Sequence, residues 1–296
     1  MPFGSSTVSR LALGTVQFGL PYGIANRTGQ VTSAAASQIL ASGNVAGIDT
    51  LDTAIGYGES ESVLGGIGVA DWRIISKLPP IPTDCADIQQ WLDAAVAGSL
   101  SRLGVPRLTG LLLHAPADLL GPHGSALVRG LGRVKAAGQS EKLGVSIYDP
   151  TELDGILTVF QPDIVQCPYN VFDRRLLTSG WLTRLHGAGT EIHVRSIFLQ
   201  GLLLMDDAAA LPKFAPWRAL LQRWQDWLAE EQVSAVAAAL NFAAQRPEIS
   251  RLVVGVDGPA QLNQIIEAAK LAVPAVPEDL QSHDLKLLNP SNWSAL

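Results

Sequence analysis

Residues 11–23 read LALGTVQFGLPYG, an apolar run that leads directly into a glycine-rich turn. Such a run is typical of a strand that is buried on both faces, as in a parallel sheet covered by helices. An open parallel sheet that binds a dinucleotide would carry GxGxxG at its first turn, and residues 14–23 lack this pattern. The opening of the chain therefore favours a closed barrel over an open doubly wound sheet.

Short apolar or β-branched runs of the same kind recur along the chain, separated by longer segments with helical periodicity. Together with the first run they are predicted as strands over residues 11–15, 47–52, 73–77, 109–114, 142–146, 164–168, 191–196 and 251–255. Parallel strands need crossover helices, and eight such units can close into a barrel that leaves no sheet edge exposed. The sequence thus predicts a single (β/α)₈ TIM-barrel domain over residues 1–296.

One connection is unusually long, from about residue 198 to residue 230, after the seventh predicted strand. It carries Trp217, Trp224 and Trp227 at helical spacing, which predicts a long loop with a helical insertion. Long connections at the carboxyl end of barrel strands are often lids over a site. The alternative is a helix that packs its tryptophans against the side of the barrel.

Composition and charge narrow the classes of partner. The net charge of −6 is spread along the chain without a basic run, so we expect no nucleic-acid partner. We find neither a signal-peptide pattern nor an apolar run of membrane-spanning length, and expect a cytoplasmic protein without a membrane partner. The two cysteines have no histidine at ligand spacing, so no metal is expected. No dimerising stripe is evident, which makes a monomer the default expectation.

Four polar residues stand where predicted strands end or just beyond, namely Asp52, Tyr57, Lys77 and His114. The carboxyl ends of barrel strands meet at one rim, where active sites of this fold lie. A phenol, with an ordinary pKa of about 10, donates a proton readily only if its anion is stabilised, and the ammonium of Lys77 could do so. Asp52 would pair with the buried lysine and His114 would orient a substrate oxygen, so the set suits carbonyl reduction.

The segments GIDTLDTAIGYGESESVLG (47–65), IISKLP (74–79) and LLLHAP (111–116) resemble the signature regions of the aldo-keto reductase superfamily. The resemblance implies an NAD(P)-dependent oxidoreductase that reduces an aldehyde or ketone, or runs the reverse reaction. It makes Asp52, Tyr57, Lys77 and His114 the catalytic tetrad, with Tyr57 as general acid or base. The opening loop resembles a bacterial subgroup associated with sugar and surface-polysaccharide metabolism, which implies a sugar-derived carbonyl substrate.

The same resemblance implies a set of cofactor contacts around the strand ends. These are Gly14, Thr15, Ser146, Gln166, Arg195, Ser196, Leu199, Gly201, Gly255, Asp257 and Gln261. Two positions depart from the family pattern: Ile147 stands where Asn is common, and Arg195 where an aromatic residue often stacks on the nicotinamide. The family favours NADP(H). Because residues 255–264 contain no basic residue to hold a 2′-phosphate, and Asp257 adds a negative charge, NAD(H) is the alternative cofactor.

The loop over residues 15–30 follows the first predicted strand, and Gln17, Phe18 and Tyr22 are its candidate substrate contacts. The alternative is that these aromatic residues only order the loop. Two other functions stay open. A catalytically idle, nicotinamide-binding regulatory relative would be expected to lose tetrad members, all of which are present. A metal-dependent barrel isomerase or lyase would need a convergent set of carboxylates and histidines.

Overall fold

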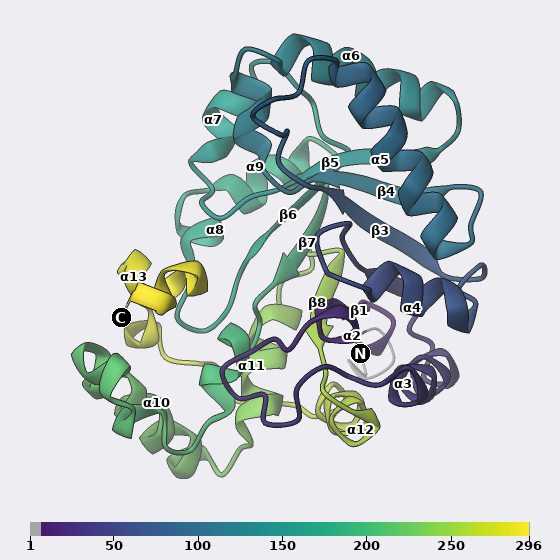
Figure 1. Ribbon diagram of the computed structural model, residues 1–296. Coiled ribbons are helices and arrows are strands. Elements are labelled where there is room, and N and C mark those ends of the chain that lie inside the picture. The colour runs from purple at the N-terminus through teal and green to yellow at the C-terminus, as the bar shows by residue number, and fades with distance from the viewer. Residues whose placement is uncertain (1–6, 296) are drawn as a thin grey trace.

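Eight parallel strands form a closed barrel in a computed structural model that describes residues 7–295 (Figure 1). Each strand pairs with the next along the chain, and the last pairs with the first, with Leu13 opposite Val254. The strands are β1 (Leu11–Gly14), β2 (Thr50–Asp52), β3 (Arg73–Leu78), β4 (Leu108–Leu113), β5 (Ser140–Ser146), β6 (Ile164–Pro168), β7 (Glu191–Arg195) and β8 (Arg251–Gly255). The predicted (β/α)₈ TIM barrel is confirmed.

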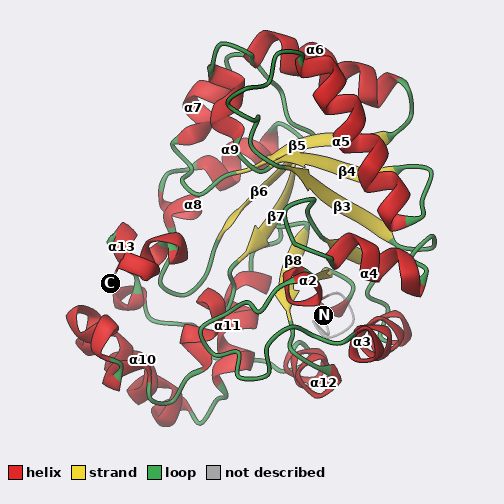
Figure 2. Ribbon diagram, in the orientation of Figure 1, coloured by secondary structure: helices red, strands yellow, loops and turns green. Residues whose placement is uncertain are grey.

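Helices alternate with the strands and surround the sheet (Figure 2). The helices of five residues or more outside the long connection are α3 (Ser33–Val45), α4 (Ser60–Ile67), α5 (Ile88–Leu103), α6 (Gly124–Ala136), α7 (Glu152–Ile156), α9 (Trp181–Gly187), α11 (Ala235–Ala244) and α12 (Pro259–Ala268). Shorter or 3₁₀ turns are α2 (Val16–Gly19), η1 (Pro116–Leu120), α8 (Arg175–Thr178), η5 (Glu278–Leu280), α13 (Leu285–Leu288) and η6 (Pro290–Ala295).

Local sequence signals fix where several of these helices begin. The side chains of Thr32, Asp87 and Ser234 each accept a hydrogen bond from the backbone N–H three residues further on. These bonds satisfy an amide that the first helical turn leaves without a partner. α3, α5 and α11 consequently start at the residue that follows each cap.

The inside of the barrel is filled by side chains. Ile75, Leu112 and Ile164, from three different strands, form a buried cluster separate from the main core between sheet and helices. A Cβ added at Gly110 would lie 2.8 Å from one methyl of Ile164 and 2.9 Å from one of Ile75, which leaves no room for a side chain there. The interior is thus a packed core that supports a site at the rim.

The long connection after β7 consists of η2 (Leu199–Leu204), η3 (Ala208–Ala210), η4 (Pro212–Trp217) and α10 (Arg218–Glu231). Its tryptophans are buried: the Trp224 indole donates to the Leu203 carbonyl oxygen at 2.9 Å and stacks on Trp227. Trp217 donates to Asp284 at 3.0 Å. The tryptophans therefore pack the insertion onto the protein, as the side-packing alternative expects, and only the η2 end reaches the barrel mouth.

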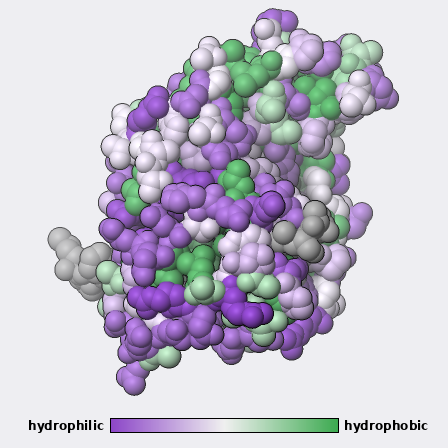
Figure 3. Space-filling view, turned by 90° about the vertical axis from the view of Figure 1, so that its left-hand side faces the viewer, coloured by the Kyte–Doolittle hydropathy of each residue, from purple (hydrophilic) through white to green (hydrophobic). Residues whose placement is uncertain are grey.

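The surface view in Figure 3 shows a mainly hydrophilic side of the molecule, on which apolar residues form small, scattered groups. No helix in the described part of the chain combines the length and apolar character needed to cross a bilayer.

Candidate active site

A cavity of about 530 Å³ opens at the carboxyl ends of the strands. It extends from Tyr57 and His114, which follow β2 and β4, to Gln261 and Gln264 on α12. Ligand pockets usually have a volume of about 300–1,000 Å³, so the space suits an extended small molecule. Its other lining residues include Gly14, Thr15, Gln17, Tyr22, Asn26, Asp52, Tyr148, Arg195, Ser196, Gln200, Gly201, Gly255 and Asp257.

Lys77 is the centre of a buried polar group at the base of this cavity. Its Nζ lies 2.6 Å from Asp52 Oδ1 and donates to the Thr53 carbonyl oxygen at 2.8 Å. The same Nζ lies 5.0 Å from the centroid of the Tyr57 ring. The second carboxylate oxygen of Asp52 accepts from Gln166 Nε2 at 2.6 Å. Both Asp52 oxygens are therefore paired, as a buried carboxylate requires.

Burial by itself lowers the pKa of the Lys77 ammonium, but the charge of Asp52, with smaller effects of Tyr57, outweighs it and raises the pKa overall. Lys77 is completely buried, so solvent does not screen the pair. The side chain consequently stays positively charged at neutral pH beside the Tyr57 phenol.

The imidazole of His114 packs edge-on against Tyr57, with ring centroids 5.7 Å apart and an interplanar angle of 76°. Burial, together with the charges of Lys77 and Arg195, lowers the pKa of His114 to about 4, against a smaller opposing effect of Asp52. At neutral pH the ring is therefore uncharged. A neutral imidazole carries one N–H, which can donate to an oxygen in the cavity.

Backbone contacts fix the turn that carries Tyr57. The Ile55 N–H donates to the carbonyl oxygen of Lys77, and the Tyr57 N–H donates to that of Ala54. A Cβ added at Gly19, the last residue of α2, would lie 1.8 Å from the Tyr57 carbonyl oxygen. The turn can approach α2 this closely only because residue 19 is glycine.

The model of the Aldo/keto reductase family matches residues 10–284. The chain belongs to this family. The earlier resemblance is thus confirmed, and family membership supports oxidoreductase activity on a carbonyl compound. Aldo-keto reductases generally use NAD(P)H.

Solved structures of aldo-keto reductases share the fold. A putative aldo-keto reductase from Pseudomonas aeruginosa is 24% identical, with a TM-score of 0.66 over 91% of this chain and 93% of that chain. A second putative one from that organism is 22% identical, with a TM-score of 0.64 over 88% and 89%. The aldo-keto reductase AKR11C1 from Bacillus halodurans, in its holo form, is 18% identical, with a TM-score of 0.72 over 90% and 88%. No curated protein matches the chain.

Most of the cofactor contacts expected for an aldo-keto reductase line the cavity. They are Gly14, Thr15, Arg195, Ser196, Gly201, Gly255, Asp257 and Gln261. Ser146 and Gln166 lie buried beneath it, and the Ser146 hydroxyl is 3.4 Å from Gln166 Oε1. The expected cofactor contact of Leu199 stays a prediction, and its side chain does not line the cavity. This residue has a φ of 47° in a tight turn and is completely buried in the core.

The three candidate substrate contacts have different surroundings. Phe18 is completely buried in the hydrophobic core and does not line the cavity, so this expectation is wrong. The single turn of α2 directs its ring inward, which the sequence of the loop does not reveal. Tyr22 lines the cavity, and its hydroxyl accepts from Gln200 Nε2 at 2.9 Å. Gln17 also lines the cavity but lies against Gly255 at the end of β8.

Sequence reasoning missed several lining residues. Tyr148 follows β5 and stacks under Arg195, and its place two residues after the expected contact Ser146 could have signalled it. Asn26 bridges the opening loop to Asp257 at 3.2 Å, and Gln200 accepts the Ile24 N–H on its carbonyl oxygen. The bond between Ile24 and Gln200 ties the loop to η2, and the purple trace of the loop passes beside α11 in Figure 1. No periodic pattern could have paired these segments.

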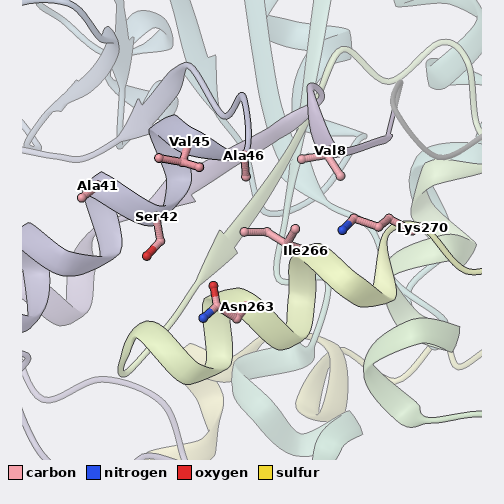
Figure 4. A pocket seen from close by; sticks show the side chains of 8 residues that line it. All are labelled: Val8, Ala41, Ser42, Val45, Ala46, Asn263, Ile266 and Lys270. Carbon is pink, nitrogen blue, oxygen red and sulfur yellow. The ribbon is translucent and has the colours of Figure 1, made fainter.

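A wider groove of about 870 Å³ lies on the outside of the barrel between α3 and α12 (Figure 4). It shares no lining residue with the cavity at the strand ends, and Lys270 is its one ionisable side chain among the described residues. The chemistry therefore belongs to the smaller cavity. Within residues 7–295, no group of three or more His, Cys, Asp or Glu side chains is arranged to hold a metal ion.

Proposed function

We propose that the protein is an NAD(P)H-dependent reductase of an aldehyde or ketone, able to run in the reverse direction, with Tyr57 as the proton donor or acceptor. One observation carries the proposal: the buried Lys77 ammonium, paired with Asp52 at 2.6 Å, lies 5.0 Å from the Tyr57 ring at the base of an open cavity. An ammonium beside a phenol stabilises the phenolate that remains after proton transfer.

Each of the four residues has a separate task in this proposal. Tyr57 delivers its proton to the oxygen of the substrate carbonyl as negative charge develops there. Lys77 stabilises the resulting phenolate, and Asp52 holds the ammonium in place. Neutral His114, packed against the Tyr57 ring, donates a hydrogen bond to the same substrate oxygen. When bound, the reduced nicotinamide supplies the hydride.

The cavity supports the binding of a nucleotide cofactor. Gln17 Oε1 is buried and has no hydrogen-bond partner among the described residues, although buried acceptors are usually paired. This oxygen would accept a hydrogen bond from a hydroxyl of the cofactor. We therefore assign Gln17 to the cofactor rather than to the substrate. Ser196 and Gly201 at the mouth would hold the phosphates, and Ser146 with Gln166 would lie under the nicotinamide.

The residues at the α12 end of the cavity favour either a weak preference for NADPH over NADH or a preference for NADH. Asp257, Gln261 and Gln264 line it, and no lysine or arginine is among the described residues that line this end. Burial raises the pKa of Asp257 more than its hydrogen bonds lower it, yet its oxygens remain acceptors that repel a phosphate. Such a site suits ribose hydroxyls better than a 2′-phosphate.

Parallel fluorescence titrations with NADH and NADPH test cofactor binding without knowledge of the substrate. Micromolar binding of either supports the proposal, and a clear preference for NADPH would refute the predicted discrimination. Tyr57→Phe should then lower kcat by about 100-fold or more, because it removes the proton donor, while the cofactor Kd stays within about twofold. Tyr169→Phe is the matched control, since its hydroxyl accepts from Arg246 and the residue does not line the cavity.

Retained turnover of Tyr57→Phe would assign the acid role to another residue. A panel of aldoses tests the sugar-derived substrate that the opening loop suggests, with simple aldehydes as the comparison. Nucleotide binding without turnover of any carbonyl compound would favour the idle relative, against which the complete tetrad argues, and failure to bind either nucleotide would refute the proposed function.

A further inference from the structure

Arg195 is the one permanently charged cation among the described residues that line the cavity. It stands at the carboxyl end of β7, where its guanidinium carbon lies 4.4 Å from the centroid of the Tyr148 ring. Its Nη2 donates to the Ile147 carbonyl oxygen at 3.0 Å, and its Nη1 donates to the Ser196 hydroxyl at 3.3 Å. The side chain is thereby held across the cavity from β7 to the segment that follows β5.

No carboxylate in residues 7–295 forms an ion pair with Arg195, whereas five other arginines have carboxylate partners, namely Arg102, Arg107, Arg175, Arg223 and Arg251. A guanidinium has about five N–H donors, and the protein uses two of those on Arg195. The other donors are free to meet a ligand. A planar guanidinium fixed by stacking and by a backbone carbonyl is well prepared for a carboxylate or phosphate, because little freedom remains to be lost.

The position of Arg195 relates it to the reacting end of the cavity. Its partners Ile147 and Tyr148 follow β5, and its charge is one cause of the lowered pKa of His114. The nucleotide end by α12 lies on the other side of β8. Since His114 is uncharged at neutral pH, Arg195 is the lining residue that can neutralise an anion in the cavity that Tyr57 and His114 also line.

We infer that Arg195 determines substrate specificity, by pairing with a carboxylate or phosphate on the carbonyl compound that is reduced. This inference rests on the proposed function, because it assigns the substrate class of the same site. The anionic group would bind at the guanidinium while the carbonyl oxygen of the substrate lies at Tyr57 and His114. Neutral carbonyl compounds would bind more weakly, since they leave the free donors of Arg195 without partners.

Matched pairs of substrates test this assignment. 4-Carboxybenzaldehyde and methyl 4-formylbenzoate differ by one charge, and glyceraldehyde 3-phosphate and glyceraldehyde form the phosphate pair. A charge-assisted hydrogen bond to a cation is worth roughly tenfold to hundredfold in kcat/KM, which sets the expected preference for the anion. Arg195→Met should bring the anion-to-neutral ratio of kcat/KM close to one, and Arg195→Lys should give an intermediate ratio.

The control variant is Arg107→Met, which removes one positive charge from an exposed ion pair with Glu141 just before β4. It should leave the ratio unchanged, because a distant exposed charge is screened by salt. Calorimetric titration of each variant with 4-carboxybenzaldehyde and with NADH measures binding without turnover. A larger preference within the first pair indicates a carboxylate, and within the second a phosphate.

Several outcomes would overturn the inference. An active wild-type enzyme with no preference for either anion would do so, and so would an unchanged ratio in Arg195→Met. A rise in the Kd for NADH of Arg195→Met, without a change in the ratio, would instead assign Arg195 to the cofactor. The wild type could bind 4-carboxybenzaldehyde but no nucleotide and turn over no substrate, while Arg195→Met loses the affinity for 4-carboxybenzaldehyde. In that case the proposed function fails and the anion site stands.

Discussion

Replacing Lys77 by methionine removes one partner of a buried ion pair and leaves the shape of the side chain nearly unchanged. Asp52 is only 4% exposed, so water replaces the lost ammonium poorly. Its Oδ1 would lose the donor at 2.6 Å, while Oδ2 would keep the Gln166 amide, also at 2.6 Å. The variant therefore has to bury a carboxylate that is only half satisfied.

The expected cost follows from this geometry. Removing one partner of a buried pair costs about 3–5 kcal/mol, mainly because the other charge stays buried and uncompensated. For a domain of this size, that loss lowers Tm by roughly 6–20 °C. The loss should appear in full at neutral pH, where the wild type keeps its ion pair.

Thermal unfolding followed by tryptophan fluorescence measures how far the Tm of Lys77→Met lies below that of the wild type. The double variant Asp52→Asn/Lys77→Met is the control, because it removes both charges and should recover most of the lost stability without recovering activity. A Tm loss below about 2 °C in Lys77→Met, which is less than about 1 kcal/mol, would refute the reasoning. A double variant as unstable as the single one would refute it as well.

Three further outcomes are expected. The pKa of His114 is held near 4, below its ordinary value of about 6.5, so the unfolded chain binds more protons than the folded protein between these pH values. Lowering the pH from 7 to 5 should therefore reduce the free energy of unfolding of the wild type by about 2 kcal/mol. His114→Gln should lack this loss, and urea unfolding at the two pH values measures it. Gly19→Ala would place a Cβ 1.8 Å from the Tyr57 carbonyl oxygen and should lower kcat at least tenfold, whereas Gly132→Ala, with open space around it, should not; equal rates in the two variants would contradict this. Glu61→Gln removes a buried carboxylate that accepts hydrogen bonds from two serines and an arginine. It should lower the free energy of unfolding by about 2–4 kcal/mol without changing kcat, and an unchanged Tm would argue against this.

The sequence alone predicted the barrel because its strands are short apolar runs, readable without knowledge of their neighbours. β6 and β8 begin and end at the predicted residues, and the other strands differ at their ends by up to three residues. The largest difference is at β2, where residues 47–49 precede the strand at Thr50. The convergence of Asp52, Tyr57, Lys77 and His114 could also be predicted, since barrel topology brings polar residues at strand ends to one rim.

Only the tertiary structure decided which side chains reach the cavity. Phe18 and Leu199 follow strands as closely as their lining neighbours do, yet both are completely buried. A single turn of α2 and a positive φ at Leu199 set these directions, and neither follows from hydrophobic pattern. Gln17 likewise lies against Gly255 because the first strand, β1, pairs with the last strand, β8.

The partners of Arg195 also separate what the sequence predicted from what only the folded structure decided. The sequence alone identified Ile147 and Arg195 as departures from the family pattern, each at its own strand end. The folded chain joins them, because the Ile147 carbonyl oxygen accepts from the Arg195 guanidinium while Tyr148 stacks on it. Side-chain direction and contacts between residues distant in sequence depend on packing of the whole barrel, so the local pattern determined which residues are present at the rim and the tertiary structure determined what they contact.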